Sequence, residues 1–164
     1  MPVSQFRTKD RPAQSFDYAD FFRRYAKAFE QSLADPSHIP TLRSFFAEHF
    51  LGLSFEGTVE AGTNDENFGR MLDEGYAFYK AIGTTAMRVE KVIAQPLHED
   101  HDRIEVFYTA EYRRPGGRQL SIPFSVVYLT QRRTDGAKIF AFIAGDEMAL
   151  YRQYGLVDEN GKPT

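Results

Sequence analysis

The chain has 164 residues, which is typical of a single domain, and carries a net charge of −3 with no block of basic residues. We therefore expect no nucleic-acid partner, because phosphate binding needs a clustered positive field. The absence of cysteine excludes disulfides, thiol nucleophiles and zinc–thiolate sites. No apolar run approaches the roughly 20 residues of a membrane span, so we expect no membrane contact and a cytoplasmic location.

The first half of the chain predicts helices. Residues 1–15 are polar and unpatterned, which indicates a flexible N-terminal arm. A first helix, capped by Ser15 or Asp17, is expected from aromatic residues at helical spacing, and Asp35-Pro36-Ser37 ends it. Pro40 then opens a short second helix that includes Leu42 and Phe50 and places His49 near its C-terminus.

A brief strand is predicted over Leu51–Glu56. The pair Thr63 and Glu66 forms a capping box for a third helix, which carries Tyr79 on its apolar side and stops at Gly83. Beyond Gly83 the pattern changes to strands, the first over Thr84–Gln95, followed by a charged turn at residues 98–102.

Three further strands are expected at 103–114, 118–132 and 137–148. Gly116-Gly117 and Asp135-Gly136 separate them, and both dipeptides favour two-residue hairpin turns because such turns need positive φ. Turns centred on these dipeptides pair residue 108 with 125 and residue 125 with 146. The predicted register therefore places Tyr108, Ser125 and Asp146 side by side on one face, together with Tyr112, Val127 and Phe142.

The order of helices followed by strands indicates an α+β fold in which helices cover one face of an antiparallel sheet. The short turns exclude parallel βαβ units. We expect one domain over residues 16–152 and a C-terminal tail over 153–164. The uncovered face is also apolar, which predicts a homodimer through the convex side of the sheet. The alternative is that the tail folds back over that face.

This element order resembles the nuclear-transport-factor-2-like superfamily, which includes SnoaL-like cyclases and ketosteroid isomerases, over residues 16–152. The run from Phe22 to Phe29 looks like the first helix of the isomerases, and Tyr25 matches their oxyanion-binding tyrosine. Glu111-Tyr112 before the Gly-Gly turn echoes the isomerase sheet. The resemblance implies a strongly curved sheet that forms a cone-shaped barrel with a pocket.

The same resemblance shows which residues of this chain fall at the acidic positions of these relatives. Ser125 falls where the isomerases keep an oxyanion-binding aspartic acid, and Glu56 is the only carboxylate near the position of their catalytic base. SnoaL-like relatives use a sheet aspartate as acid and base, and Asp146 lies on the last predicted strand.

Asp146 is the sharpest catalytic candidate, because burial on an apolar face would raise the pKa of its carboxyl and suit acid–base chemistry. The alternative is a solvated carboxylate at the strand end. Tyr25 is the second catalytic candidate, and core packing is its alternative. Candidates for ligand contact are Tyr108, Tyr112, Ser125, His49, Tyr79, Phe142 and Val127. His49 could equally interact with a helix dipole.

The histidines and carboxylates of residues 98–102 suit a solvated hairpin tip better than a metal loop, so we expect no metal and no cofactor. The sequence then leaves two functions open. One is an enzyme of the isomerase, cyclase, dehydratase or hydrolase type that uses acid–base chemistry on a small apolar or aromatic molecule. The other is a non-catalytic ligand-binding or dimerisation module of the same fold.

Overall fold

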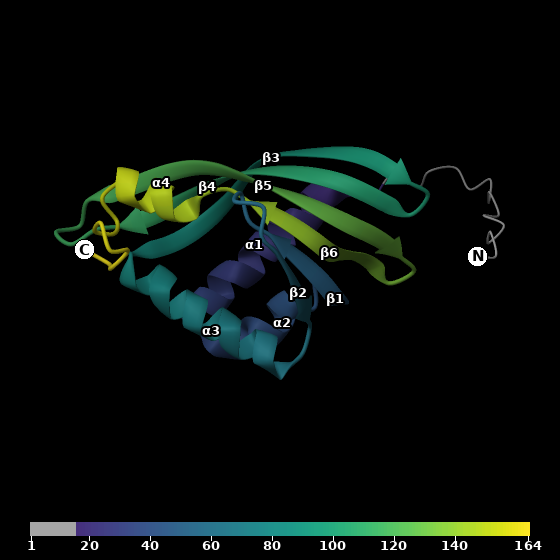
Figure 1. Ribbon diagram of the computed structural model, residues 1–164, viewed down its shortest axis with the longest axis horizontal. Coiled ribbons are helices and arrows are strands. Elements are labelled where there is room, and N and C mark those ends of the chain that lie inside the picture. Colours follow the sequence, from purple (N-terminus) through teal and green to yellow (C-terminus); the bar gives the residue numbers. More distant parts are fainter. Residues whose placement is uncertain (1–15) are drawn as a thin grey trace.

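The computed structural model describes residues 16–164, so the arm expected at residues 1–15 lies outside the described residues. Helices α1 (Tyr18–Ala34), α2 (Ile39–Arg43) and α3 (Glu66–Ala81) pack beneath one face of a six-stranded sheet, and α4 (Glu147–Gln153) lies at the end near the C-terminus (Figure 1). This arrangement confirms the α+β prediction, although the sheet is open rather than closed into a barrel. No helix in the described range is long and apolar enough to cross a membrane.

Helix α1 begins where the sequence predicts. The carboxylate of Asp17 caps it by accepting a hydrogen bond from the backbone N–H of Asp20 at 2.9 Å. Phe21 and Phe22 point into the core, and the ring of Phe22 packs against Tyr128 with centroids 4.7 Å apart. The aromatic stripe on α1 therefore attaches this helix to the inner face of the sheet.

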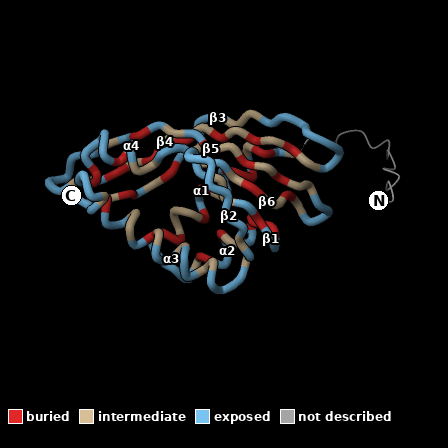
Figure 2. The backbone as a smooth tube through the Cα atoms, viewed as in Figure 1, coloured by how far each residue is buried: buried red, intermediate tan, exposed pale blue. Residues whose placement is uncertain are grey.

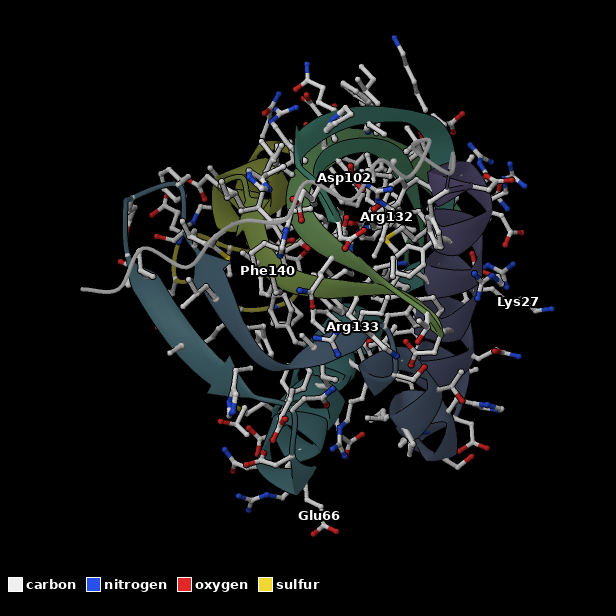
Figure 3. The ribbon with its side chains drawn as sticks, turned by 90° about the vertical axis from the view of Figure 1, so that its right-hand side faces the viewer. Lys27, Glu66, Asp102, Arg132, Arg133 and Phe140 are labelled. Atoms are coloured by element: carbon white, nitrogen blue, oxygen red, sulfur yellow. The ribbon has the colours of Figure 1, made fainter. Side chains whose placement is uncertain are left out.

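A buried polar cluster holds the start of α1 against the sheet. The hydroxyl of Tyr18 donates to Asp102 Oδ2 at 2.5 Å, and Arg132 Nε donates to the same oxygen at 2.8 Å. Thr130 Oγ1 donates to the Tyr18 hydroxyl at 2.8 Å. Asp102 and Arg132 lie on neighbouring strands beside α1 (Figure 3). Asp102, expected in a charged turn, is thus a buried residue of a strand.

The expected second helix is too long. A single 3-10 turn, η1 (Pro36–His38), precedes α2, which ends at Arg43, and strand β1 (Phe46–Leu53) follows. Phe46 and Phe50 are both buried, and a spacing of four residues fits the same side of a strand as well as of a helix. His49 therefore lies on a strand with its side chain exposed. Strand β2 (Val59–Thr63), which was not predicted, pairs with β1.

The remaining strands are β3 (Thr84–His98), β4 (His101–Arg113), β5 (Gln119–Arg133) and β6 (Gly136–Ala144). They form the expected antiparallel series, and the full order is β2-β1-β6-β5-β4-β3. Strand β1 runs parallel to β6, so the sheet is mixed rather than purely antiparallel.

The predicted register between β4 and β5 is wrong by one residue. Tyr108 pairs with Phe124, whereas Ser125 pairs with Phe107 and lies on the outer face. Residues 114–118 join these strands. Arg114 N–H donates to Arg118 O at 2.8 Å and closes a three-residue loop, 115–117, in place of the expected two-residue turn. Because side chains alternate along a strand, one extra loop residue moves all of β5 to the opposite face.

The predicted pairing of Ser125 with Asp146 is also wrong. Arg133 pairs with Gly136 across a two-residue turn, and the pairing shifts by one residue between Leu129 and Thr130. Val126 consequently faces Ala144, where β6 ends. Asp146 lies beyond the sheet.

The C-terminal segment packs on the inner side of the sheet. Leu156 and Val157 are buried in a cluster with Ile82, Ala110 and Ile122. The outer face is left uncovered by this segment, so the alternative in which the tail covers it is wrong. Buried residues concentrate between the helices and the sheet, while the outward surfaces of the helices are exposed (Figure 2).

Gly83 supplies a test of how α3 is joined to the sheet. Its φ is +88°, and an added Cβ would lie 2.2 Å from the backbone oxygen of Arg113. We expect Gly83→Ala to lower the free energy of unfolding by more than about 1 kcal/mol in urea denaturation. The matched variant Gly75→Ala, inside α3 with no atom within 4 Å of its added Cβ, should raise it by about 0.5–1 kcal/mol. Equal effects would contradict this geometry.

Candidate functional site

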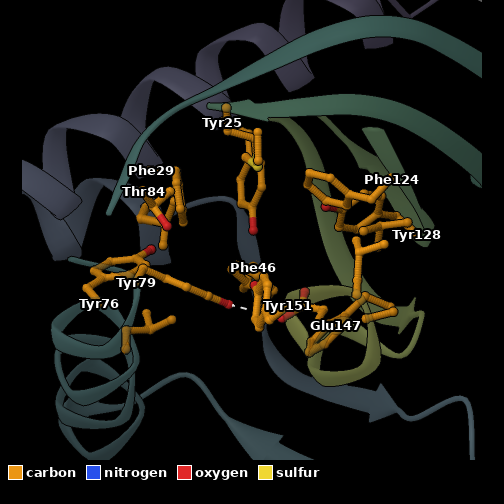
Figure 4. A pocket seen from close by; sticks show the side chains of 18 of the residues that line it. Tyr25, Phe29, Phe46, Tyr76, Tyr79, Thr84, Phe124, Tyr128, Glu147 and Tyr151 are labelled. Carbon is orange, nitrogen blue, oxygen red and sulfur yellow. Dashed lines mark hydrogen bonds between the residues drawn. The ribbon is translucent and has the colours of Figure 1, made fainter. Parts of the chain in front are cut away.

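A cavity of about 240 Å³ lies between α1, α3, α4 and the inner face of the sheet (Figure 4). A dry protein cavity of about 150 Å³ is large enough to hold benzene. The cavity can therefore accept a molecule larger than a single unsubstituted ring.

The wall of the cavity is dominated by aromatic rings. From residues 16–164 it contains six tyrosines, five phenylalanines and a single charged side chain, Glu147. The aromatic members are Tyr25, Tyr76, Tyr79, Tyr112, Tyr128, Tyr151, Phe29, Phe46, Phe68, Phe124 and Phe142. The rest are Leu42, Leu72, Thr84, Met87, Ala110, Val126, Ala144 and Leu150. The chemistry of the cavity therefore centres on one carboxyl group and several phenols.

Glu147 is the first residue of α4, and its carboxylate is held from two helices. Its Oε2 accepts hydrogen bonds from the hydroxyls of Tyr79 at 3.4 Å and Tyr151 at 3.3 Å. Burial raises the pKa of Glu147, and the two phenol hydrogen bonds oppose that rise only in part. A carboxyl group whose pKa is raised by burial is suited to general acid–base chemistry, because it can give as well as take a proton.

The phenols around Glu147 stay protonated. Burial raises the pKa of Tyr25 to about 12 and that of Tyr112 to about 12. Burial, together with the negative charge of Glu147, raises the pKa of Tyr79 and Tyr151 further. These hydroxyls therefore act as hydrogen-bond donors, and Glu147 is left as the proton-exchanging group of the wall.

Residues that carry hydroxyl groups also line the cavity from α1 and the sheet. Tyr25 points its hydroxyl into the space (Figure 4). The hydroxyl of Tyr128 lies 3.1 Å from that of Tyr108. Tyr128 also interacts with the hydroxyl of Tyr25 and opposes in part the rise in the pKa of Tyr25 that burial causes. The buried Thr84 Oγ1 has no hydrogen bond of good geometry, although it lies close enough to Tyr112 to lower that pKa.

The structure brings together four of the residues singled out in the sequence. Tyr25, Tyr79, Tyr112 and Phe142 all line the cavity. Tyr108 packs behind the wall, where it is 1% exposed and stacks on Phe124.

The other candidates lie elsewhere. Ser125 and Val127 belong to the outer face because of the register of β5, and His49 and Glu56 are exposed. Asp146 is exposed, and its carboxylate caps α4 by accepting from the backbone N–H of Ala149 at 2.8 Å. The burial from which we expected acid–base character in Asp146 is absent. Within residues 16–164 no group of three or more histidines and carboxylates could hold a metal ion.

The sequence reasoning missed Glu147 because it extended the last strand through Met148. A signal for the correct boundary was present: Asp146 is a favourable N-cap residue, and an acidic residue in the next position is typical of a first helical turn. A prediction that ended the strand before Asp146 would have placed Glu147 in the first turn of a helix, with its side chain toward the other helices.

Comparison with known proteins gives a family and a fold. The sequence pattern of a family described as "NTF2-like protein (DUF6841)" matches residues 16–147. No curated protein matches the chain.

Several solved structures share the fold at low sequence identity. An NTF2-like protein with a cystatin-like fold from Novosphingobium aromaticivorans is 12% identical, with a TM-score of 0.60, over 82% of this chain and 83% of that chain. The protein Aln2 from a Streptomyces species is 12% identical, with a TM-score of 0.59, over 82% and 91%. A protein from N. aromaticivorans, provisionally named an aromatic ring hydroxylase, is 15% identical, with a TM-score of 0.54, over 77% and 84%.

The raised pKa of Glu147 predicts a pH-dependent effect on stability. At low pH the Glu147 carboxyl is protonated in both the folded and the unfolded state. No charge is buried on folding, so the raised pKa does not lower stability there. As pH rises past the usual glutamate pKa, the carboxyl ionises first in the unfolded state. The folded state then loses stability, by about 1.4 kcal/mol for each pH unit by which the pKa of Glu147 in the folded state exceeds that in the unfolded state. Glu147→Gln should therefore melt at a higher temperature than the wild type at pH 7–8, and this advantage should shrink toward pH 4.

Asp146 provides the comparison within the same turn. Asp146→Ala removes the cap of α4 and should lower the free energy of unfolding by about 1 kcal/mol. Asp146→Asn keeps a capping oxygen and should change the free energy of unfolding little.

Thermal melts of Glu147→Gln that differ from the wild type by the same amount at every pH would contradict the assignment of Glu147.

Proposed function

Because the chain belongs to the NTF2-like family, we propose that its cavity binds a small, largely apolar or aromatic molecule and that Glu147 moves a proton on it. The family supports small-molecule binding. The observation that carries the proposal is a partly buried carboxyl group, held by two phenols, in a wall whose other members among residues 16–164 are neutral. A titratable group perturbed by burial in a cavity is typical of a functional site.

The proposed chemistry uses both protonation states of Glu147. Its ionised form would take a proton from a carbon or a water, and its protonated form would give that proton to a leaving group or to another carbon. The hydroxyl of Tyr25 is placed to donate a hydrogen bond to a ligand oxygen that gains negative charge. This division of roles fits a cofactor-independent isomerase, cyclase, dehydratase or hydrolase. Ligand binding without catalysis is the alternative within the same cavity.

The size of the ligand can be tested by filling the cavity. Ala144 lines the wall from β6, so Ala144→Leu should weaken the binding of bicyclic aromatic compounds at least 10-fold, as measured by ligand-observed NMR. Ala61→Leu makes the same change at an exposed position on β2 and should leave binding unchanged. Equal affinity of the wild type and Ala144→Leu would place the ligand elsewhere.

For any bound compound that is turned over, Glu147→Gln should lower kcat by about 10²-fold, within the range of general acid–base catalysis. Asp146→Asn serves as the neighbouring control and should leave kcat unchanged. The reverse pattern would return the catalytic role to Asp146.

The outer face of the sheet favours a second role as a dimer interface. Val127, Ile143, Leu53 and Val59 form one row there, because each is the register partner of the next. A parallel row contains Leu129, Ala141 and Leu51. Of these, Leu51, Val59 and Ile143 are at least 41% exposed. We infer that this face pairs with a second copy of the chain, since contiguous exposed apolar residues mark interaction surfaces.

Light scattering at micromolar concentration should then give twice the chain mass of 18.8 kDa. Ile143→Lys, on the apolar row, should give the monomer mass. Met71→Lys alters an exposed apolar residue on α3, away from this face, and should leave the dimer intact. A monomeric wild type would refute the interface.

A further inference from the structure

The cavity wall contains a carboxyl group, that of Glu147, which no cation within residues 16–164 balances when it ionises. Among the residues that the structure describes, no lysine, arginine or histidine belongs to its wall. Glu147 takes part in none of the salt bridges within residues 16–164. A buried charge that lacks a partner of opposite sign is unfavourable, and a ligand that supplies that partner removes the penalty.

The carboxylate also has room for a partner. Both phenol hydrogen bonds reach Oε2, whereas Oε1 receives neither. The negative charge acts across the cavity, because it raises the pKa of Tyr25, Tyr79, Tyr112 and Tyr151, which come from α1, α3, β4 and α4. A positive centre entering the space would therefore be attracted to Glu147.

The aromatic wall adds to this preference. Ring faces carry partial negative charge and attract cations within about 6 Å, by about 0.5–1 kcal/mol at exposed sites and about 2 kcal/mol when desolvated. Five phenylalanines and six tyrosines surround the space, and Tyr79 and Tyr151 are also the phenols that contact Glu147. An aromatic enclosure with one carboxylate matches the chemistry of an organic cation with an apolar remainder.

We propose that the ligand of this cavity is an organic cation, either an amine that is protonated at neutral pH or a quaternary ammonium, whose positive centre lies against Glu147 and the aromatic rings. This inference rests on the proposed function of the cavity as a small-molecule site and specifies the charge of the molecule. An anion would meet repulsion from Glu147, and a neutral molecule would leave the carboxylate without a partner.

Three probes of similar size separate these classes: phenyltrimethylammonium, its neutral isostere tert-butylbenzene, and the anion benzoate. Titrations at pH 7.5, followed by NMR, should show the cation binding at least 10-fold more tightly than the neutral isostere, which corresponds to about 1.4 kcal/mol. Benzoate should bind most weakly. In Glu147→Gln the preference for the cation should fall below 3-fold.

Glu66→Gln is the matched control. Glu66 is an exposed first-turn acid of α3, as Glu147 is a first-turn acid of α4, but its side chain points away from the molecule (Figure 3). The change in net charge is the same, so this variant should keep the wild-type preference. Loss of the preference in both variants would mean that the probes sense overall charge, and would overturn the assignment to the cavity.

A measurement on the wild type does not depend on any variant folding. Cation affinity should rise between pH 4 and pH 8 as Glu147 ionises, while tert-butylbenzene affinity should not. The facing groups, Tyr25 on α1, Tyr79 on α3, Tyr112 on β4 and Tyr151 on α4, stay protonated over that range. The other facing phenols, those of Tyr76 on α3 and Tyr128 on β5, also have raised pKa values because they are buried.

The outcomes distinguish the two proposals. Equal binding of the cation and the neutral isostere, blocked by Ala144→Leu, would overturn the cation preference and leave the small-molecule site standing. Binding of none of the three probes would overturn the cation proposal and count against the small-molecule site as well. A cation preference that survives in Glu147→Gln would also overturn the proposal.

Discussion

The pairing register of β4, β5 and β6 decides which side chains reach the cavity. With Tyr108 opposite Phe124, the residues of β5 that line the cavity are Phe124, Val126 and Tyr128. A shift of one residue would replace all three with residues of the outer face, including Ser125 and Val127. The three-residue loop at 115–117 sets this register, and it therefore determines the aromatic character of the site.

The second constraint is the point at which β6 ends. Because the strand stops at Ala144, α4 starts early enough to turn Glu147 inward, while Asp146 remains outside as the cap. Tyr79 from α3 and Tyr151 from α4 then reach the same carboxylate oxygen. The partial burial of this carboxylate opposes folding, and the packing of the surrounding aromatic rings offsets it. Local conflict with stability is characteristic of functional sites.

Local sequence signals predicted most helices and strands well. They predicted less well the strand pairing and register, which depend on residues far apart in the chain. The cap at Asp17, the stop at Gly83 and the strands from residue 84 onward depend on neighbouring residues, and the structure has them. Phe46 and Phe50 fit a helix or a strand equally, so their element depended on pairing with β2 and β6. Pro115 precedes Gly116 and cannot donate a ladder hydrogen bond, which favours the longer loop, and that loop decides the face of every residue in β5.

For the same reason the sequence predicted Tyr25 and Tyr79 as site residues but did not predict Glu147. Tyr25 and Tyr79 lie on helices whose apolar sides are readable from spacing alone. Glu147 depends on a strand boundary, and a strand that continued through Met148 would have placed its side chain on the opposite face. Asp146, chosen on that premise, performs a different task as a helix cap.

Glu147 is a partly buried carboxyl group that forms no ion pair with any cation of residues 16–164. A titration of the wild-type protein, followed through the ¹³C signal of the Glu147 side-chain carboxyl, measures this directly. A midpoint above the ordinary glutamate pKa of 4.5, and a lower midpoint once an organic cation is bound, is the result expected from the structure. A midpoint at or below 4.5 in the free protein would contradict it.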